Sequence, residues 1–173
     1  MSDESKFAKP ELIELREAWP REDQDFTPWL ADNLDYLTDL GFGHLSIIDT
    51  EVRVPGVGRQ LDILAETVDE RRVAIENQYR SLDHDHLTRG LAYAVGLEAE
   101  ALVLIAEDHH SEFRAVADYL NRAAEVVGES GIPVFLVTVK VERLGDYLIP
   151  RFEIITRPNS WRAEVAAASA ALE

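Results

Sequence analysis

The segment Ala101-Leu102-Val103-Leu104-Ile105-Ala106 is apolar at every position. A strand with one exposed face would alternate apolar and polar residues, so this run predicts a central strand that is covered on both faces, as in a parallel sheet. Residues 72–78 form an earlier apolar strand, and a helical pattern over about 84–97, capped by Asp83 or Ser81, lies between the two strands. A strand, a helix and a strand in this order predict a right-handed crossover between parallel neighbours.

Further elements are expected on both sides of this unit. Thr27 as N-cap, Pro28 at the first helical position and a break at Gly41 predict a helix over about 28–40. The remaining patterns predict strands at 45–54, 60–66, 133–141 and 151–156, a helix at 111–127 and a terminal helix that opens at about 158. The resulting order, α-β-β-β-α-β followed by α-β-β, predicts an α/β fold with a mixed central sheet flanked by helices.

The chain has the size of a single domain. Its 173 residues, of which 46% are hydrophobic, are enough for one well-packed core. We expect that domain over residues 20–162, preceded by an N-terminal extension at 1–19 and followed by a C-terminal tail at 163–173. The sequence contains no cysteine, which excludes a disulfide framework, a thiolate zinc site and a cysteine nucleophile. No apolar run approaches membrane-spanning length, so we expect a cytoplasmic protein with no membrane partner.

The charge of the chain is strongly negative but unevenly distributed. Lys and Arg number 17 against 33 Asp and Glu, for a net charge of −16, which would repel nucleic acid if it were spread evenly. Residues 51–93 hold six arginines against eight acids, so this segment carries −2 and the rest of the chain −14. It is therefore the least repulsive segment for a nucleic acid. The alternative account of the net charge is a solvated acidic surface that implies no partner.

Two acids lie on two of the predicted strands. Asp62 and Glu76 belong to apolar strands that are separated by a short polar turn, so a hairpin would bring both carboxylates to one end of the sheet. Carboxylate oxygens are the ligands that hard cations such as Mg²⁺ prefer. The pair therefore predicts the beginning of a magnesium site, and the alternative is that Glu76 and Gln78 are ordinary polar residues at a strand end.

The element order and these acids resemble the PD-(D/E)XK nuclease superfamily. Asp62 and Glu76-Asn77-Gln78 correspond to its short acidic motif. Together with Phe26-Thr27-Pro28-Trp29-Leu30 and Asp83-His84-Asp85-His86-Leu87, they are similar to an uncharacterised prokaryotic branch with ENQ and DHDHL motifs. The resemblance covers about residues 20–162. It implies an enzyme that uses Mg²⁺ or Mn²⁺ to hydrolyse phosphodiester bonds in DNA.

The resemblance also implies roles for individual residues. Asp62 and Glu76 would bind the metal, Asn77 would offer its backbone carbonyl, and Gln78 would orient the attacking water. The superfamily commonly has lysine where Gln78 stands. A glutamine neither takes a proton nor supplies positive charge to the transition state. A second hypothesis follows, in which the fold no longer cuts and serves as a binding or regulatory module.

Members of the superfamily commonly add an acid from the first helix to the metal shell. Asp32 is the expected ligand, because Glu22 and Asp25 precede the predicted cap at Thr27. In the helix at 84–97, His86, Arg89 and Tyr93 are spaced i, i+3 and i+7. They would share one face that looks toward the acids.

Arginines and histidines near the acids are the expected substrate contacts. Arg59, Arg80 and Arg89 would meet phosphates, and His84, His86 and Tyr93 would complete the substrate-binding set. The run from Asp83 to His86 also has the ligand types of a zinc or manganese site, although Asp83 as a helix cap explains part of it equally well. A homodimer that presents two sites to a duplex is compatible with either functional hypothesis.

Overall fold

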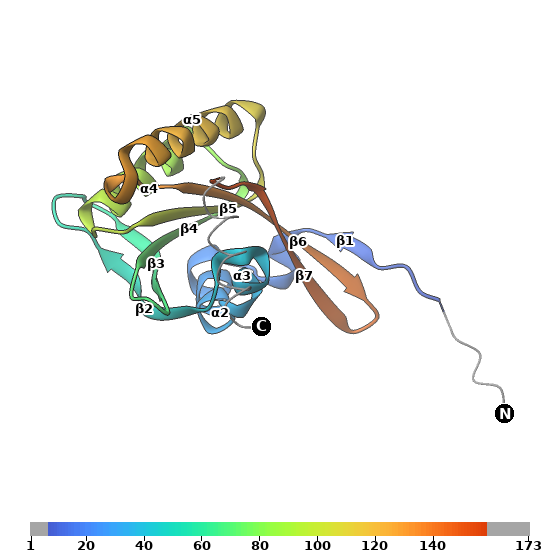
Figure 1. The fold of residues 1–173 in the computed structure, drawn as a ribbon. Helices are drawn as coiled ribbons and strands as arrows, with labels where there is room; N and C mark the ends of the chain where they lie inside the picture. Colours follow the sequence, from blue (N-terminus) through green and yellow to red (C-terminus); the bar gives the residue numbers. More distant parts are fainter. Residues whose placement is uncertain (1–6, 159–173) are drawn as a thin grey trace, which may run out of the picture.

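The computed structural model describes residues 7–158, which form one seven-stranded sheet with helices on both faces (Figure 1). The strands are β1 (Glu11–Ile13), β2 (Leu45–Arg53), β3 (Gln60–Thr67), β4 (Arg72–Ser81), β5 (Ala101–Asp108), β6 (Val134–Leu144) and β7 (Tyr147–Thr156). The helical elements are α1 (Leu15–Ala18), η1 (Glu22–Phe26), α2 (Thr27–Asp32), α3 (Asp35–Leu37), η2 (Thr38–Phe42), α4 (His84–Gly96), α5 (Ser111–Val127) and η3 (Gly128–Ser130).

The sheet is mixed, with the strand order β1-β6-β5-β4-β3-β2 and with β7 paired to β6. β2, β3 and β4 form an antiparallel meander, whereas β4, β5 and β6 are parallel neighbours joined by α4 and α5. β7 returns antiparallel along β6, and β1 pairs antiparallel with the end of β6. The α/β fold class and the α-β-β-β-α-β order expected from the sequence are confirmed.

Each face of the sheet buries its own apolar cluster. α4 and α5 cover one face with residues that include Leu87, Tyr93 and Phe113. The short N-terminal helices cover the other face with Phe26 and Leu30, on the opposite side in Figure 1. Because β5 lies between the two layers, its residues 101–106 are all buried, as their uninterrupted apolar character predicted.

The predicted helix over 28–40 is wrong in its continuity. The chain forms the π-helical turn η1 before it, and then α2, α3 and the π-helical turn η2 in place of one helix. Asn33 interrupts the pattern: its side-chain amide donates to the backbone oxygen of Trp29 at 2.7 Å, the acceptor that its own N–H would use in a continuing helix. Thr27 caps nothing, because α2 has no side-chain cap.

The N-terminal segment packs as part of the sheet. β1 pairs with β6, and Leu15 and Trp19 are buried in the cluster that contains Phe26. The predicted terminal helix from about 158 and the tail at 163–173 lie outside the described residues. Within residues 7–158, no helix is both long and apolar enough to cross a membrane.

Candidate functional site

Asp62 and Glu76 face each other at the point where β3 and β4 part. The backbone ladder between these strands ends at Ile63 and Ile75. One residue further on, the backbone N–H of Asp62 donates to Oε2 of Glu76 at 3.1 Å. The backbone N–H of Asn77 donates to Oδ2 of Asp62 at 2.7 Å. Beyond the end of the backbone ladder, these hydrogen bonds to the two carboxyl groups thus connect β3 and β4 and fix both side chains.

Burial and mutual repulsion disfavour the charged forms of this pair. Glu76 is only 4% exposed and Asp62 is half-buried. Burial raises the pKa of Glu76, and the neighbouring charge of Asp62 raises it further. Burial likewise raises the pKa of Asp62; the N–H of Asn77 opposes this rise, and repulsion from Glu22 and Glu51 adds to it. Within residues 7–158, neither carboxylate forms an ion pair with lysine or arginine. A bound cation would relieve both effects.

Glu22, and not Asp32, is the N-terminal acid that approaches this pair. η1 turns the Glu22 carboxylate toward β4, where it accepts the backbone N–H of Tyr79 at 2.6 Å. Burial raises the pKa of Glu22, and its charge contributes to the raised pKa of Asp62. Asp32 is exposed at the end of α2 and takes part in none of these interactions. The sequence discounted Glu22 because it precedes Thr27, and no sequence pattern marks the π-helical turn that returns it to the site.

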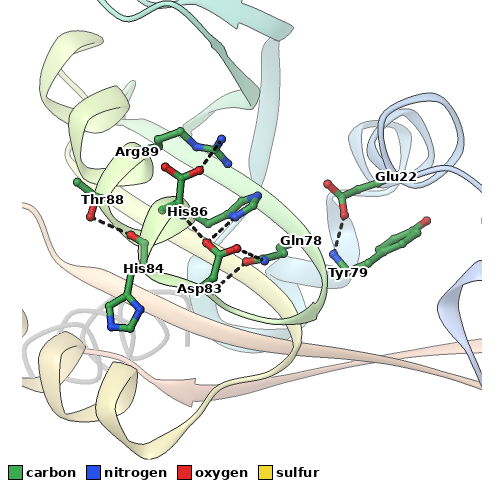
Figure 2. A network of polar contacts seen from close by, with 9 residues as sticks. Glu22, Gln78, Tyr79, Asp83, His84, His86, Thr88 and Arg89 are labelled. Carbon is green, nitrogen blue, oxygen red and sulfur yellow. Dashed lines mark hydrogen bonds and ion pairs between the residues drawn. The ribbon is translucent and has the colours of Figure 1, made fainter.

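The amide of Gln78 is bonded on both sides to Asp83. Its Nε2 donates to Oδ2 of Asp83 at 2.8 Å, and its Oε1 accepts the backbone N–H of Asp83 at 3.1 Å (Figure 2). Asp83 in turn caps α4 by accepting the backbone N–H of His86 at 2.8 Å. A left-handed residue, Arg80 with φ 65°, turns the chain between Gln78 and Asp83. The side-chain oxygen and one side-chain N–H of Gln78 are therefore hydrogen-bonded to the residue that caps α4.

The face of α4 that carries Arg89 and Tyr93 lies toward Glu76. The charge of Arg89 opposes the raised pKa of Glu76. Burial raises the pKa of Tyr93, the charge of Glu76 raises it further, and Arg89 and Arg59 oppose that rise. Arg89 also pairs with Asp85 at 3.0 Å. Two of the predicted substrate-binding residues, Arg89 and Tyr93, thus lie near Glu76, and a third, Arg59, lies near Tyr93.

His86 shares this face, whereas His84 does not. The Nδ1 atom of His86 lies 2.8 Å from Oδ1 of Asp83, and the charge of His86 opposes the raised pKa of Glu22. The side chain of His84 is 83% exposed, and its ring packs edge-on against Phe113 of α5. Figure 2 shows His84 pointing away from Asp83 and His86.

The side chain of Asn77 and the residue Arg80 make their hydrogen bonds away from the acidic pair. The Asn77 side chain lies on the opposite face of the sheet, where its Nδ2 donates to the hydroxyl of Thr27 at 3.1 Å. Only the main chain of Asn77 is at the acidic pair, because successive side chains of a strand point to opposite faces of the sheet. Arg80 is exposed, and its backbone N–H donates to the carboxylate of Glu107.

The oxygen donors at the pair match the chemistry of a small hard cation. Mg²⁺ is bound in proteins through one or two carboxylates and keeps several waters. Asp62, Glu76 and the backbone carbonyl of Asn77 offer such a set. Among the described residues, no group of three or more acidic or histidine side chains surrounds one point. With Asp62, Glu76 and the Asn77 carbonyl as ligands, a Mg²⁺ or Mn²⁺ ion would keep water in its remaining positions.

Two surface cavities lie away from this pair. One, of about 980 Å³, is lined by residues at the turn between β3 and β4 and at the end of α5, including Arg72, Glu100 and Gly131. The other, of about 460 Å³, lies along β7. Neither cavity is lined by Asp62 or Glu76. The candidate site is therefore identified by its chemistry and not by the size of a cavity.

Comparisons with known proteins find no match in sequence and a distant similarity in structure. No family model matches the sequence, and no curated protein matches it. Among solved structures, the crystal structure of a repair endonuclease from Pyrococcus abyssi is similar, with a TM-score of 0.41 and 14% sequence identity. The similarity covers 75% of this chain but only 62% of that one, which is less than two thirds of its length. At this level of similarity, the assignment of the site depends on the geometry of Asp62, Glu76 and their neighbours.

Proposed function

We propose that the protein is a nuclease that uses Mg²⁺ or Mn²⁺ to hydrolyse phosphodiester bonds in DNA. The observation that carries the proposal is the facing pair of Asp62 and Glu76 at the end of the β3–β4 ladder, where burial raises both pKa values. Such a pair is destabilised without a cation and becomes a ligand set with one. The α-β-β-β-α-β order and the arginines beside the pair support the same reaction class.

The residues around the pair have distinct roles in this proposal. Asp62 and Glu76 hold the metal, with the backbone carbonyl of Asn77 as a further oxygen ligand. A bound divalent ion lowers the pKa of a water molecule and neutralises charge that develops on the phosphoryl oxygens. Arg89, which lies near Glu76, and Arg59, which lies near Tyr93, bind phosphates of the substrate, because guanidinium groups match phosphate geometry.

Metal binding is the first test. Isothermal titration calorimetry with MgCl₂ or MnCl₂ should show binding to the wild-type chain and a loss of affinity in Asp62→Asn and Glu76→Gln, which remove charge with little change in shape. Glu66→Gln is the matched control, because Glu66 also lies on β3 but stands opposite Arg72 at the other end of the β3–β4 ladder. Wild-type binding that survives both substitutions would contradict this metal site.

Cleavage is the second test. Supercoiled plasmid, linear duplex and single-stranded oligonucleotides are incubated with the full chain and Mg²⁺ or Mn²⁺. Cleavage that is lost in Glu76→Gln and kept in Glu66→Gln supports the proposal. Metal binding without cleavage of any of these substrates would overturn it.

A binding or regulatory module is the second candidate, and the two bonds between Gln78 and Asp83 favour it. They leave the amide with little capacity to orient a water, and no lysine stands in its place. In that case, a DNA probe is retained by the wild-type protein without cleavage, and Glu76→Gln does not change the retention. Sedimentation with and without duplex would show whether two copies assemble on one substrate.

A further inference from the structure

Asp83 and His86 form a carboxylate–imidazole pair at the edge of the candidate site. Oδ1 of Asp83 lies 2.8 Å from Nδ1 of His86, while Oδ2 accepts the amide of Gln78 at 2.8 Å. Burial opposes ionisation of Asp83, but the His86 and Gln78 donors outweigh it and lower its pKa to about 2. An ionised carboxylate only accepts hydrogen bonds, so Nδ1 of His86 carries the proton and Nε2 keeps its lone pair.

The position of His86 relates it to the acids and to Gln78. Arg89 and Tyr93, one and two turns further along α4, act on Glu76. Since α4 returns antiparallel to β4, His86 lies at the level of Gln78, two residues beyond Glu76 on the same face of the strand. In Figure 2 the imidazole of His86 extends toward the side on which Glu22 lies, away from His84.

Helix capping explains only part of this arrangement. The cap of α4 needs the Asp83 carboxylate and the backbone N–H of His86. It does not need the imidazole ring, nor the second carboxylate oxygen that holds Gln78. The ring is only 21% exposed, and the contact of its Nδ1 with Asp83 sets its orientation.

We propose that His86 is the proton acceptor for the attacking water, that Asp83 orients its ring, and that Gln78 holds Asp83 in place. This inference rests on the proposed nuclease function. It assigns to His86 the task that Gln78 cannot perform, and it makes Asp83 and Gln78 positioning residues. The bonds of Gln78 to Asp83 then belong to the catalytic arrangement.

The step balances without a further reagent. The water oxygen bonds to phosphorus, its proton passes to Nε2 of His86, and the bond from phosphorus to the leaving sugar oxygen breaks with its electron pair on that oxygen. The leaving oxygen takes a proton from solvent, and His86 later returns its own proton to solvent. The ionised Asp83 lies against the resulting imidazolium, the Glu22 carboxyl is near enough to interact with the charge of His86, and Arg89 of the same helix is paired with Asp85.

Chemical rescue is the decisive experiment. In His86→Gly, with Mg²⁺ or Mn²⁺ and the plasmid substrate, kcat should fall by about 10²-fold to 10⁴-fold with little change in KM. Added imidazole should restore part of kcat. It should not restore Glu76→Gln, which lacks a metal ligand. His44→Gly is the matched control, because His44 is exposed before β2, at the end of β3 away from Asp62.

Asp83→Ser tests the positioning role separately from folding. Serine keeps the N-cap of α4 but has no carboxylate for His86 and Gln78, so the melting temperature should change little while kcat falls. His86→Asn keeps the backbone donor of the cap and removes the proton acceptor. If His86→Asn stays within about twofold of wild type while Glu76→Gln is inactive, His86 is not the acceptor and the nuclease function stands. If the wild type cleaves nothing, both proposals fall.

Discussion

Because of Asp62 and Glu76, we expect the metal-free protein to lose stability as the pH rises. Carboxyl groups of an unfolded chain lose their protons at about pH 4. Burial and mutual repulsion raise the pKa of both groups in the folded state. Above about pH 4 the folded state therefore binds more protons than the unfolded state, and this pair lowers the free energy of unfolding as pH rises.

The expected result is a pH-dependent difference between wild type and Glu76→Gln. Melting temperatures of metal-free protein should fall more steeply for the wild type between pH 5 and about pH 8, because glutamine removes one of the raised carboxyls. Mg²⁺ should raise the wild-type melting temperature more at the alkaline end, since the ligands must lose their protons to bind it. Parallel curves for the two proteins would contradict the raised pKa values.

Residue spacing predicted that Asp62 and Glu76 lie together and that Arg89 and Tyr93 share a face toward them, but it did not predict the contacts of Gln78. The positions of Asp62 and Glu76 follow from apolar strands joined by a turn, a short-range pattern that the ladder reproduces. The engagement of Gln78 depends on the left-handed Arg80, which reverses the chain toward Asp83. A non-glycine residue in that conformation carries no clear sequence signal, so the bonds that occupy the amide were not predictable.

At the scale of the elements, α4 is placed by its close contact with β5. Gly90 lies on the buried side of α4, and a Cβ atom there would come within 3.0 Å of Leu104 and 3.2 Å of Leu102. Both leucines are fully buried and have little space to yield. Gly90 therefore lets α4 approach the sheet closely enough for Arg89 and Tyr93 to act on Glu76.

Gly90→Val should lower both stability and activity. Overpacking of this contact is expected to reduce the free energy of unfolding by about 1–3 kcal/mol, measured in urea. Because the helix must move outward, metal-dependent cleavage should also fall. Thr88→Val is the control, since Thr88 is exposed on the same helix and valine there is equally β-branched. A stable Gly90→Val protein would show that the contact between α4 and β5 can relax.

Elements with strong periodicity were predicted well, and those stabilised by tertiary contacts were not. The helix at 111–127 matches α5, because its apolar stripe repeats over several turns. The segment that follows Thr27 shows the same pattern, yet Asn33 breaks it by bonding the Trp29 carbonyl. The residues of β1 alone do not identify its partner in the sheet, since its pairing with β6 joins residues more than 120 positions apart.

For the whole molecule, the distribution of charge decides how DNA could approach. With a net charge of −16, most of the surface repels a duplex, so contacts must concentrate near the arginines of residues 51–93. In the structure Arg89 lies near Glu76, Arg59 lies near Tyr93, and Arg80 is exposed at the end of β4. Binding through so few cations implies a shallow salt dependence, about −0.9 in log K against log salt for each phosphate neutralised.

Arg59→Gln should therefore change the salt slope, and Arg122→Gln should not. Binding of a fluorescent duplex to the non-cleaving Glu76→Gln background, measured by anisotropy across a salt series, should have a slope of about −3 or shallower if three arginines contact phosphates. Removing Arg59 should make that slope shallower by about 1. Arg122 is exposed on α5 and serves as a matched loss of charge. Equal changes in both variants would mean that long-range charge, and not contact at the Asp62–Glu76 site, governs DNA binding, since the two substitutions alter the net charge identically.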